Sequence, residues 1–121
     1  MKRKSDPRHQ KRIKIIRNLF QWDFRRQKVN TAVARIIENL PIIDGMISAS
    51  APERPISEIN RIDLAILRLS VSELIIEKDA PFKVIVDEAV ELGKEYGSSS
   101  SPGFINGVLG KIIAGQKLDQ E

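Results

Sequence analysis

The stretch "APFKVIVDEAVELGKEYGSSSSPGFINGVLGKI", from Ala80 to Ile112, predicts two consecutive helices joined by a polar turn. Apolar residues recur at three- and four-residue steps in both halves, which places them on one helix face. We expect Asp79 to cap the first helix, Pro81 to occupy its first position, and Gly97 to end it in a left-handed conformation. Its expected buried residues are Phe82, Ile85, Val86, Ala89 and Leu92.

The second half of the stretch predicts a helix that glycine weakens. We expect Ser101 as its cap, Pro102 as its first residue and Gly115 at its end. Each interior glycine costs a helix roughly 1 kcal/mol relative to alanine. We therefore expect Gly107 to allow a neighbouring helix to approach closely. The expected buried residues are Phe104, Ile105, Val108, Leu109 and Ile112.

A first upstream segment with helical spacing begins near Arg8 and fades near Gln27. Its apolar face holds Ile13, Ile16, Leu19, Phe20 and Phe24. The basic residues that fall mostly on its other faces are Arg8, Lys11, Arg12 and Arg25.

Two further segments follow before the opening stretch. Asn30 or Thr31 can cap a helix that continues to about Ser48. Pro41 lacks an N–H and should kink this helix. Ser57 can cap the next helix after a loop rich in proline and small residues.

The whole pattern predicts an all-α protein, because no segment alternates with period two. We expect a compact bundle of five to six helices in one domain, residues 8–117. Within it, residues 8–48 carry the N-terminal helices, 49–56 a linker loop and 57–117 the C-terminal helices. Residues 1–7 are expected to form a flexible basic tail and 118–121 a C-terminal tail.

Composition argues against catalysis and against a metal site. The chain has no cysteine and one histidine, and it carries neither a glycine-rich phosphate loop nor an HExxH pair. Asp87, Glu88 and Glu91 lie close along one helix, and we interpret them as a solvated face on which Glu91 and Lys94 are neighbours. We expect no enzymatic activity, no metal and no cofactor.

Hydropathy predicts a cytoplasmic protein without membrane association. No apolar run approaches the ~20 residues of a membrane span. The basic N-terminus also lacks the apolar stretch of a signal peptide.

Charge is distributed unevenly along the chain. Residues 1–28 hold eleven Lys/Arg against two Asp, whereas the remainder holds nine basic and fourteen acidic residues. Such asymmetry favours an anionic partner for the first segment, with nucleic acid as the natural candidate because binding releases counterions from phosphates. A solvated basic tail is the alternative.

Aromatic residues are interleaved with these basic ones in "RHQKRIKIIRNLFQWDFRR", Arg8 to Arg26. Such rings can stack on unpaired bases while arginine and lysine hold phosphates. We expect Phe24 and Trp22 to be core residues instead, and Phe20 to lie at the edge of the core.

Three ordered blocks resemble the C-terminal helices of the NusB family of bacterial transcription antitermination factors. They are "RIDLAILRLSVSELI" (Arg61 to Ile75), "APFKVIVDEAVELGKEYG" (Ala80 to Gly97) and "FINGVLGKI" (Phe104 to Ile112). "LFQWDF" (Leu19 to Phe24) resembles the signature of the family's first helix. The resemblance implies an all-helical fold of two small packed subdomains.

The resemblance also implies a function without enzymatic activity or cofactor. Members bind the boxA element of ribosomal RNA leader and antitermination transcripts, together with the small-subunit ribosomal protein NusE. That pair helps RNA polymerase, within an antitermination complex, to read past terminators. Some members self-associate through the RNA-binding face, so either a monomer or a weak homodimer fits the resemblance.

The resemblance assigns roles to individual residues. Those expected at the RNA are Arg8, His9, Lys11, Arg12, Phe20, Ser100 and Phe104. Asp63 matches the acidic residue that faces NusE, and Arg68 matches the arginine that follows it. Ser100 and Gly103 stand where relatives often carry charges, and the link between the first helix and Asn30 is shorter than usual.

Two other functions remain open at this point. One is an RNA-recognition domain related to those of ribosomal RNA cytosine methyltransferases, although no cofactor-binding motif accompanies it in this sequence. The other is a helical adaptor that binds protein and has no strong RNA affinity.

Overall fold

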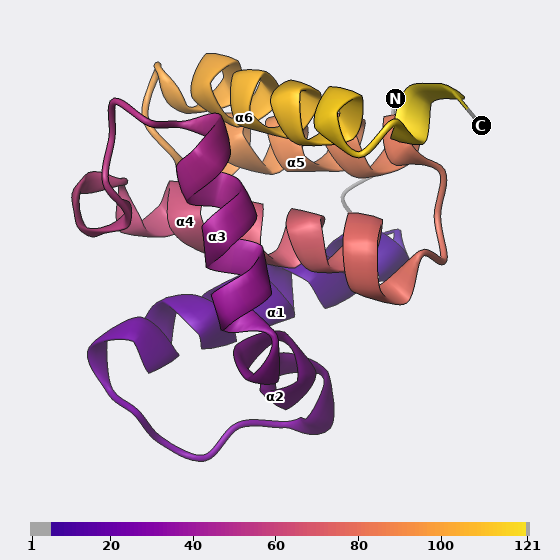
Figure 1. Cartoon of the computed structure of the whole chain (residues 1–121). Coiled ribbons are helices and arrows are strands. Elements are labelled where there is room, and N and C mark those ends of the chain that lie inside the picture. The colour runs from indigo at the N-terminus through magenta and orange to yellow at the C-terminus, as the bar shows by residue number, and fades with distance from the viewer. Residues whose placement is uncertain (1–5, 121) are drawn as a thin grey trace.

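The computed structural model describes residues 6–120, and within that range the regular secondary structure is entirely helical (Figure 1). The six α-helices are α1 (Pro7–Phe24), α2 (Thr31–Glu38), α3 (Leu40–Ser50), α4 (Arg61–Val71), α5 (Phe82–Tyr96) and α6 (Ser101–Gly115). Three shorter turns are η1 (Ile56–Glu58), η2 (Ser72–Glu77) and η3 (Leu118–Gln120). The all-α prediction is confirmed.

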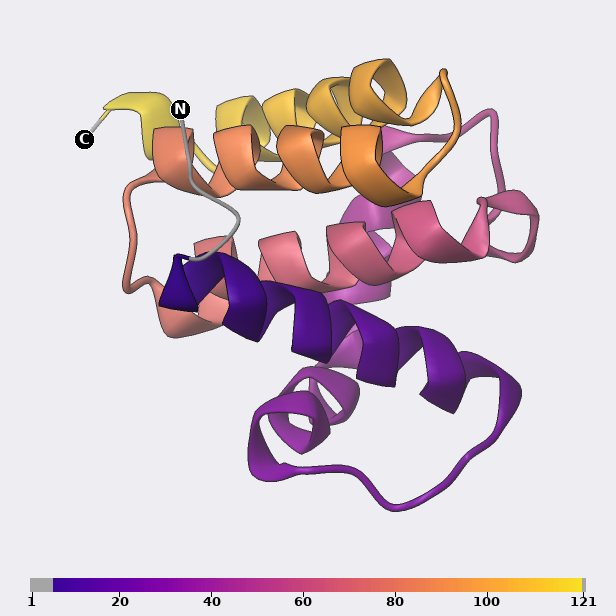
Figure 2. The same ribbon diagram turned by 180° about the vertical axis from the view of Figure 1, so that it is seen from behind.

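Helix α4 is the centre of the packing. It contacts α1, α3, α5 and α6, and both ribbon views show α5 and α6 side by side on one side of it and α1 on the other (Figure 2). Every residue from Asp63 to Val71 is buried, as expected for a helix that is enclosed all round. Helices α1–α3 and α4–α6 therefore meet across a shared core.

The chain breaks near Pro41 instead of bending there. A single kinked helix was expected, but α2 ends at Glu38 and α3 begins at Leu40. Pro41 donates no hydrogen bond, and its ring would collide with the carbonyl four residues earlier. The Asn39 N–H instead donates to the carbonyl oxygens of Ile36 and Ile37, which closes α2.

Helix starts differ from the expected caps except at α2. There the Asn30 side chain accepts from the Val33 N–H at 3.0 Å, as predicted. Helix α4 is capped by Asn60 instead of Ser57: the Asn60 side chain accepts from two N–H groups of the first turn, whereas Ser57 lies within η1. Pro81 itself, and not Asp79, is the residue that precedes α5.

The termini also begin and end differently from the expected tails. Pro7 is already the first residue of α1, and the Asp6 carboxylate caps that helix by accepting from the Arg8 N–H at 2.8 Å. That hydrogen bond lowers the pKa of Asp6. At the other end, η3 occupies most of the predicted C-terminal tail. The rest of both tails, residues 1–5 and 121, lies outside the described residues.

Close packing between α5 and α6 depends on glycine at the end of α5. A Cβ at Gly97 would lie 2.6 Å from Ser101 Cβ and 2.8 Å from the Gly93 carbonyl oxygen. Gly97 has φ −95°, so the predicted left-handed conformation is wrong, and its small size is what matters. Ser101 does not cap α6 either: its buried hydroxyl accepts from the Ser98 N–H at 2.9 Å.

The close approach expected at Gly107 is absent. A Cβ there would meet nothing within 4 Å. We therefore expect Gly107→Ala to raise the free energy of unfolding by about 0.5–1 kcal/mol through better helix propensity. The matched Gly97→Ala change should lower it by about 1–3 kcal/mol because the added methyl group overpacks the α5–α6 turn. Urea denaturation of both variants measures the difference, and equal effects would contradict this interpretation.

Candidate nucleic-acid interface

The exposed side of α1 carries a ridge of basic side chains. Arg8, Lys11, Lys14 and Arg17 are all exposed and follow one another at three-residue steps. Residues three apart on a helix are neighbours on its surface. Each three-residue step also turns about 60° around a helix of 3.6 residues per turn, so these four residues, called the basic ridge below, form a cationic strip that winds obliquely around α1.

The structure buries two residues that were predicted to contact RNA. His9 is 2 % exposed, with Nδ1 3.2 Å from Glu88 Oε2 and Nε2 3.2 Å from Glu95 Oε1. Arg12 is 8 % exposed and so does not lie on an outer face of the helix as expected. Neither side chain is presented to a phosphate in this structure.

Arg12 is the hub of a buried ion network. Its Nε and Nη2 donate to the two Glu73 carboxylate oxygens at 2.9 and 2.7 Å, and its Nη1 donates to Glu88 Oε1 at 3.1 Å. The hydrogen bond to Glu73 is the main reason that the pKa of Arg12 is raised. The network joins α1 to η2 and α5, so Arg12 positions these elements relative to one another.

Glu88 was interpreted as part of a solvated face, and this is wrong. Its side chain is 2 % exposed. The sequence did hold a signal for this, because Glu88 falls between Ile85 and Leu92 on the apolar face of the helix. The Glu91–Lys94 neighbour pair was predicted correctly, with Nζ and Oε2 4.0 Å apart.

The aromatic residues of α1 are more exposed than expected. Phe24 is 67 % exposed and is not a core residue. Its ring meets that of Phe20 edge-on, with centroids 5.0 Å apart. Trp22 is half-buried and lies beneath the Arg26 guanidinium, 3.9 Å from the ring centroid.

Phe104 and Ser100 lie at the start of α6, which the loop between α3 and α4 reaches through Arg54. The Arg54 guanidinium stacks 4.2 Å above the centroid of the Phe104 ring. Ser100 is exposed, and its hydroxyl is 3.1 Å from that of Ser98. Phe20 instead lines a hollow of about 150 Å³ beside Tyr96, so the predicted residues do not all converge on one site.

Asp63 and Arg68, the expected partner contacts, are buried at 2 % and 6 % exposure. Arg68 donates to both Asp44 oxygens at 3.0 and 2.9 Å and lies 3.5 Å from Asp23. It thereby ties α1 and α3 to α4. Burial raises the pKa of Asp63, although a hydrogen bond from Ser101 and the charge of Arg54 act in the opposite direction. Neither residue is presented at the surface.

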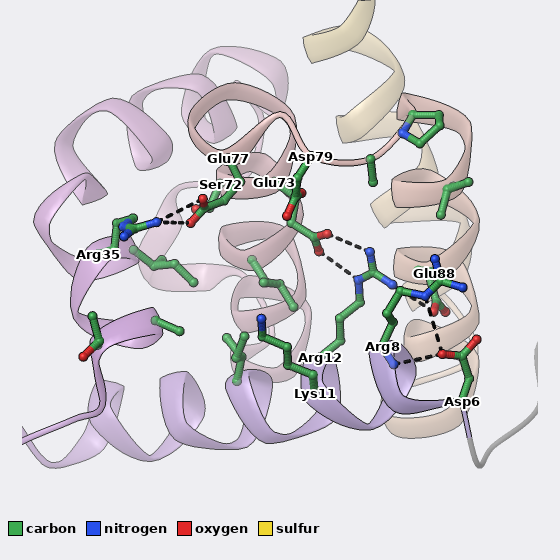
Figure 3. Close-up of a pocket in the computed structure, with 18 residues that line it drawn as sticks. Asp6, Arg8, Lys11, Arg12, Arg35, Ser72, Glu73, Glu77, Asp79 and Glu88 are labelled. Atoms are coloured by element: carbon green, nitrogen blue, oxygen red, sulfur yellow. Dashed lines mark hydrogen bonds and ion pairs between the residues drawn. The ribbon is translucent and has the colours of Figure 1, made fainter.

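A groove of about 640 Å³ opens between α1, α2, η2 and the start of α5 (Figure 3). One wall comes from η2, a wide π-helical turn closed by a hydrogen bond from the Lys78 N–H to the Glu73 carbonyl oxygen at 2.9 Å. This turn places Ser72, Glu73 and Glu77 along the groove. Sequence reasoning missed this wall, because α-helical spacing does not describe a π turn.

The groove combines apolar depth with a charged rim. Ile15, Ile36 and Leu69 are buried residues that line it. Arg35 Nη1 lies 3.1 Å from each Glu77 carboxylate oxygen at the rim. Lys11 rises from α1 toward the middle of the groove (Figure 3).

Residues 6–120 contain neither a metal-binding cluster nor a membrane-spanning helix. That range contains no group of three histidine, cysteine or acidic side chains arranged to hold a metal ion. None of its helices is long and apolar enough to cross a bilayer.

Comparison with known proteins gives one consistent family. Residues 21–114 match the NusB family model. The chain is 37 % identical to transcription antitermination protein NusB of Alkaliphilus oremlandii, over 87 % of this chain and 78 % of the relative. It is 35 % identical to the NusB protein of Thermotoga sp. strain RQ2, over 88 % of this chain and 89 % of that one.

A solved structure matches the fold as well. T. maritima NusB aligns with a TM-score of 0.82 at 29 % identity, covering 96 % of this chain and 99 % of that one. The agreement extends over the helices that carry the basic ridge, the groove and both buried arginines.

Removal of the Arg12 guanidinium should strongly destabilise the fold. We expect Arg12→Met to lower the free energy of unfolding by about 3–5 kcal/mol, because Glu88 would remain buried without this partner. Lys11→Met, one residue away but exposed, should change it by less than about 0.5 kcal/mol. Urea denaturation followed by circular dichroism measures both. Similar losses in the two variants would refute the hub role.

The raised pKa of Asp63 predicts a pH-dependent stability difference. The folded protein holds the Asp63 proton more tightly than the unfolded chain, whose reference pKa is 3.8. Its contribution to stability is therefore complete below that value and is lost as the pH rises through the folded pKa. Asp63→Asn, which stays neutral, should gain stability relative to the parent protein between about pH 4 and pH 7.

Urea denaturation at both pH values provides the measurement. Asp87→Asn, at an exposed position of α5, is the matched control and should show no such trend. A stability of Asp63→Asn that stays constant or falls relative to that of the parent protein as the pH rises would oppose the assignment.

Proposed function

Because the chain belongs to the NusB family of transcription antitermination proteins, we propose that it binds single-stranded, boxA-like RNA together with ribosomal protein NusE. In this role it modulates termination by RNA polymerase, notably in ribosomal RNA transcription. Antitermination factors of this family are not enzymes. The observation that carries the RNA proposal is the basic ridge on α1.

The basic ridge suits a phosphate backbone because most of its side chains form no ion pair within the described protein. Lys11, Lys14 and Arg17 have no ion-pair partner among residues 6–120, and Arg8 meets only Asp6, at 3.7 Å. Each lysine or arginine that neutralises a phosphate releases counterions and adds about −0.7 to the salt slope on single-stranded RNA. Exposed residues Arg25, Arg26 and Lys28 extend the positive charge beyond the end of α1.

Two aromatic surfaces outside the ridge are suited to unpaired bases. Phe24 is the most exposed large apolar side chain described, and aromatic faces stack on single-stranded bases whatever their sequence. Phe104 with its stacked Arg54 offers a second aromatic surface at the start of α6. We propose that these rings supply base contacts while the ridge supplies phosphate contacts.

We assign NusE to the apolar hollow between α1, α4 and α5. Ile13, Ile16, Phe20, Ile62 and Tyr96 line it together with Arg17. An apolar hollow of about 150 Å³ suits a protein side chain better than a phosphate. This assignment replaces Asp63 and Arg68, which the fold buries.

Neutralising the ridge should weaken RNA binding in a salt-dependent way. We expect the double variant Arg8→Gln/Lys11→Gln to reduce the slope of log K against log salt by about 1.4 if each residue contacts one phosphate. Lys111→Gln, at an exposed position on α6, should leave the slope unchanged. Fluorescence polarisation with a boxA-like RNA and a scrambled control, with and without NusE, provides the measurement.

The results with NusE, with the double variant and without RNA affinity test different parts of the proposal. Tighter binding of the boxA-like RNA when NusE is present supports the full proposal. An unchanged salt slope in the double variant would remove the ridge from the interface. Capture of NusE without measurable RNA affinity would favour a protein-binding adaptor.

A further inference from the structure

We propose that the groove between α1, α2, η2 and α5 is a nucleotide pocket that takes the base inward and the phosphate on Lys11. The proposal rests on the proposed RNA-binding function and adds a defined base subsite to it. The volume of about 640 Å³ falls in the range of small-molecule sites, about 300–1,000 Å³.

The interior of the groove suits the face of a planar base. Its deep residues are aliphatic side chains from three different helices, namely Ile15, Ile36 and Leu69. Ala32 and Ala80 leave space at the sides because their side chains are small. A ring that enters this space removes apolar surface from water on both partners.

Charges around the opening are arranged asymmetrically. On the α1 side, Lys11 is an exposed cation with no ion-pair partner among residues 6–120, whereas its neighbour Arg12 is paired with Glu73. On the opposite side, that of η2, the wall presents Asp79 and Glu77, and Glu77 is paired with Arg35 of α2. A ligand that spans the groove therefore meets the Lys11 cation on one side, and on the other the Asp79 carboxylate and the Glu77–Arg35 pair.

Carboxylates make the pocket selective among bases. An ionised carboxylate only accepts hydrogen bonds, and its two oxygens offer about four lone-pair sites. The Glu77 oxygens therefore keep acceptor capacity beyond the Arg35 contact, and a base edge that faces them must donate. Guanine presents adjacent N–H donors on its Watson–Crick edge, whereas uracil presents two carbonyl oxygens around one N–H. We therefore expect guanine and other bases with an exocyclic amino group to bind in preference to uracil.

The η2 wall of the groove also contains a buried polar group without a hydrogen-bond partner in the described part of the chain, the Ser72 hydroxyl. This hydroxyl is buried in η2, and no hydrogen-bond partner exists for it among the described residues. An unsatisfied buried polar group costs about 1–3 kcal/mol. Ser72 lines the groove, so an occupant that displaces the wall slightly would bring a partner to this hydroxyl.

The test compares free mononucleotides with RNA on the full chain. Titration with GMP, AMP, CMP and UMP, followed by amide chemical shifts in NMR spectra, should show GMP binding about tenfold more tightly than UMP. The shifted amides should come from the groove elements. Lys11→Gln should weaken GMP binding several-fold, and Lys111→Gln should not.

Two substitutions test separately the space in the groove and the hydrogen bonding by Glu77. Ala32→Leu fills the groove and should weaken GMP binding about tenfold, which corresponds to 1.4 kcal/mol, whereas Ala114→Leu at an exposed site on α6 should have no effect. Glu77→Gln gives the wall a donor as well as an acceptor, so it should reduce the preference for GMP over UMP while binding persists. This second variant keeps the test valid should Ala32→Leu fail to fold.

Failure of the pocket is distinguishable from failure of RNA binding. RNA binding with the full salt slope, together with no GMP shifts and no effect of Ala32→Leu on RNA affinity, would overturn the pocket and leave the basic ridge intact. GMP binding without RNA affinity would support a pocket for a free nucleotide and overturn the RNA function. Equal affinity for all four mononucleotides would overturn the role given to the carboxylates.

Discussion

The buried guanidinium of Arg12 is the interaction on which the arrangement of the two halves depends. It reaches Glu73 and Glu88, which lie 61 and 76 residues further along the chain, and so fixes α1 against η2 and α5. A buried ion of this kind persists only when its hydrogen-bonding groups are paired. Arg68 repeats the device with Asp23 and Asp44 and fixes α1 and α3 against α4. The groove is the space that the first clamp leaves between α1, α2 and η2.

These clamps also divide the basic residues of the N-terminal segment into two classes. Arg12 is neutralised inside the protein, whereas Lys11, its immediate neighbour, extends into the groove opening without a partner in the described chain. The positive charges available to an anionic ligand are therefore those without an ion-pair partner inside the described protein. A phosphate contact that requires Arg12 would have to break a buried network, whereas one that uses the basic ridge would not.

Much of the fold was predictable from local patterns, and most of the errors are local in origin. Apolar periodicity located the helices, and Asn30 was recognised as a cap. The starts of α4 and α5 were misplaced because several polar residues precede each helix and only the three-dimensional turn selects among them. Phe24 was predicted to be buried because it continues the apolar stripe of α1, but α4 meets this end of the helix at Asp23 and leaves the Phe24 side chain 67 % exposed.

The sequence by itself determined the helical class, the concentration of positive charge in the N-terminal segment and the membership of the family. These properties depend on residue spacing and composition, which are read along the chain. Only the tertiary structure decided which charges are free, that Asp63 and Arg68 are buried, and that a π turn, α1 and α2 enclose a groove. The reason is that these outcomes depend on partners many residues away, whose proximity is set by packing around α4 and not by any local pattern.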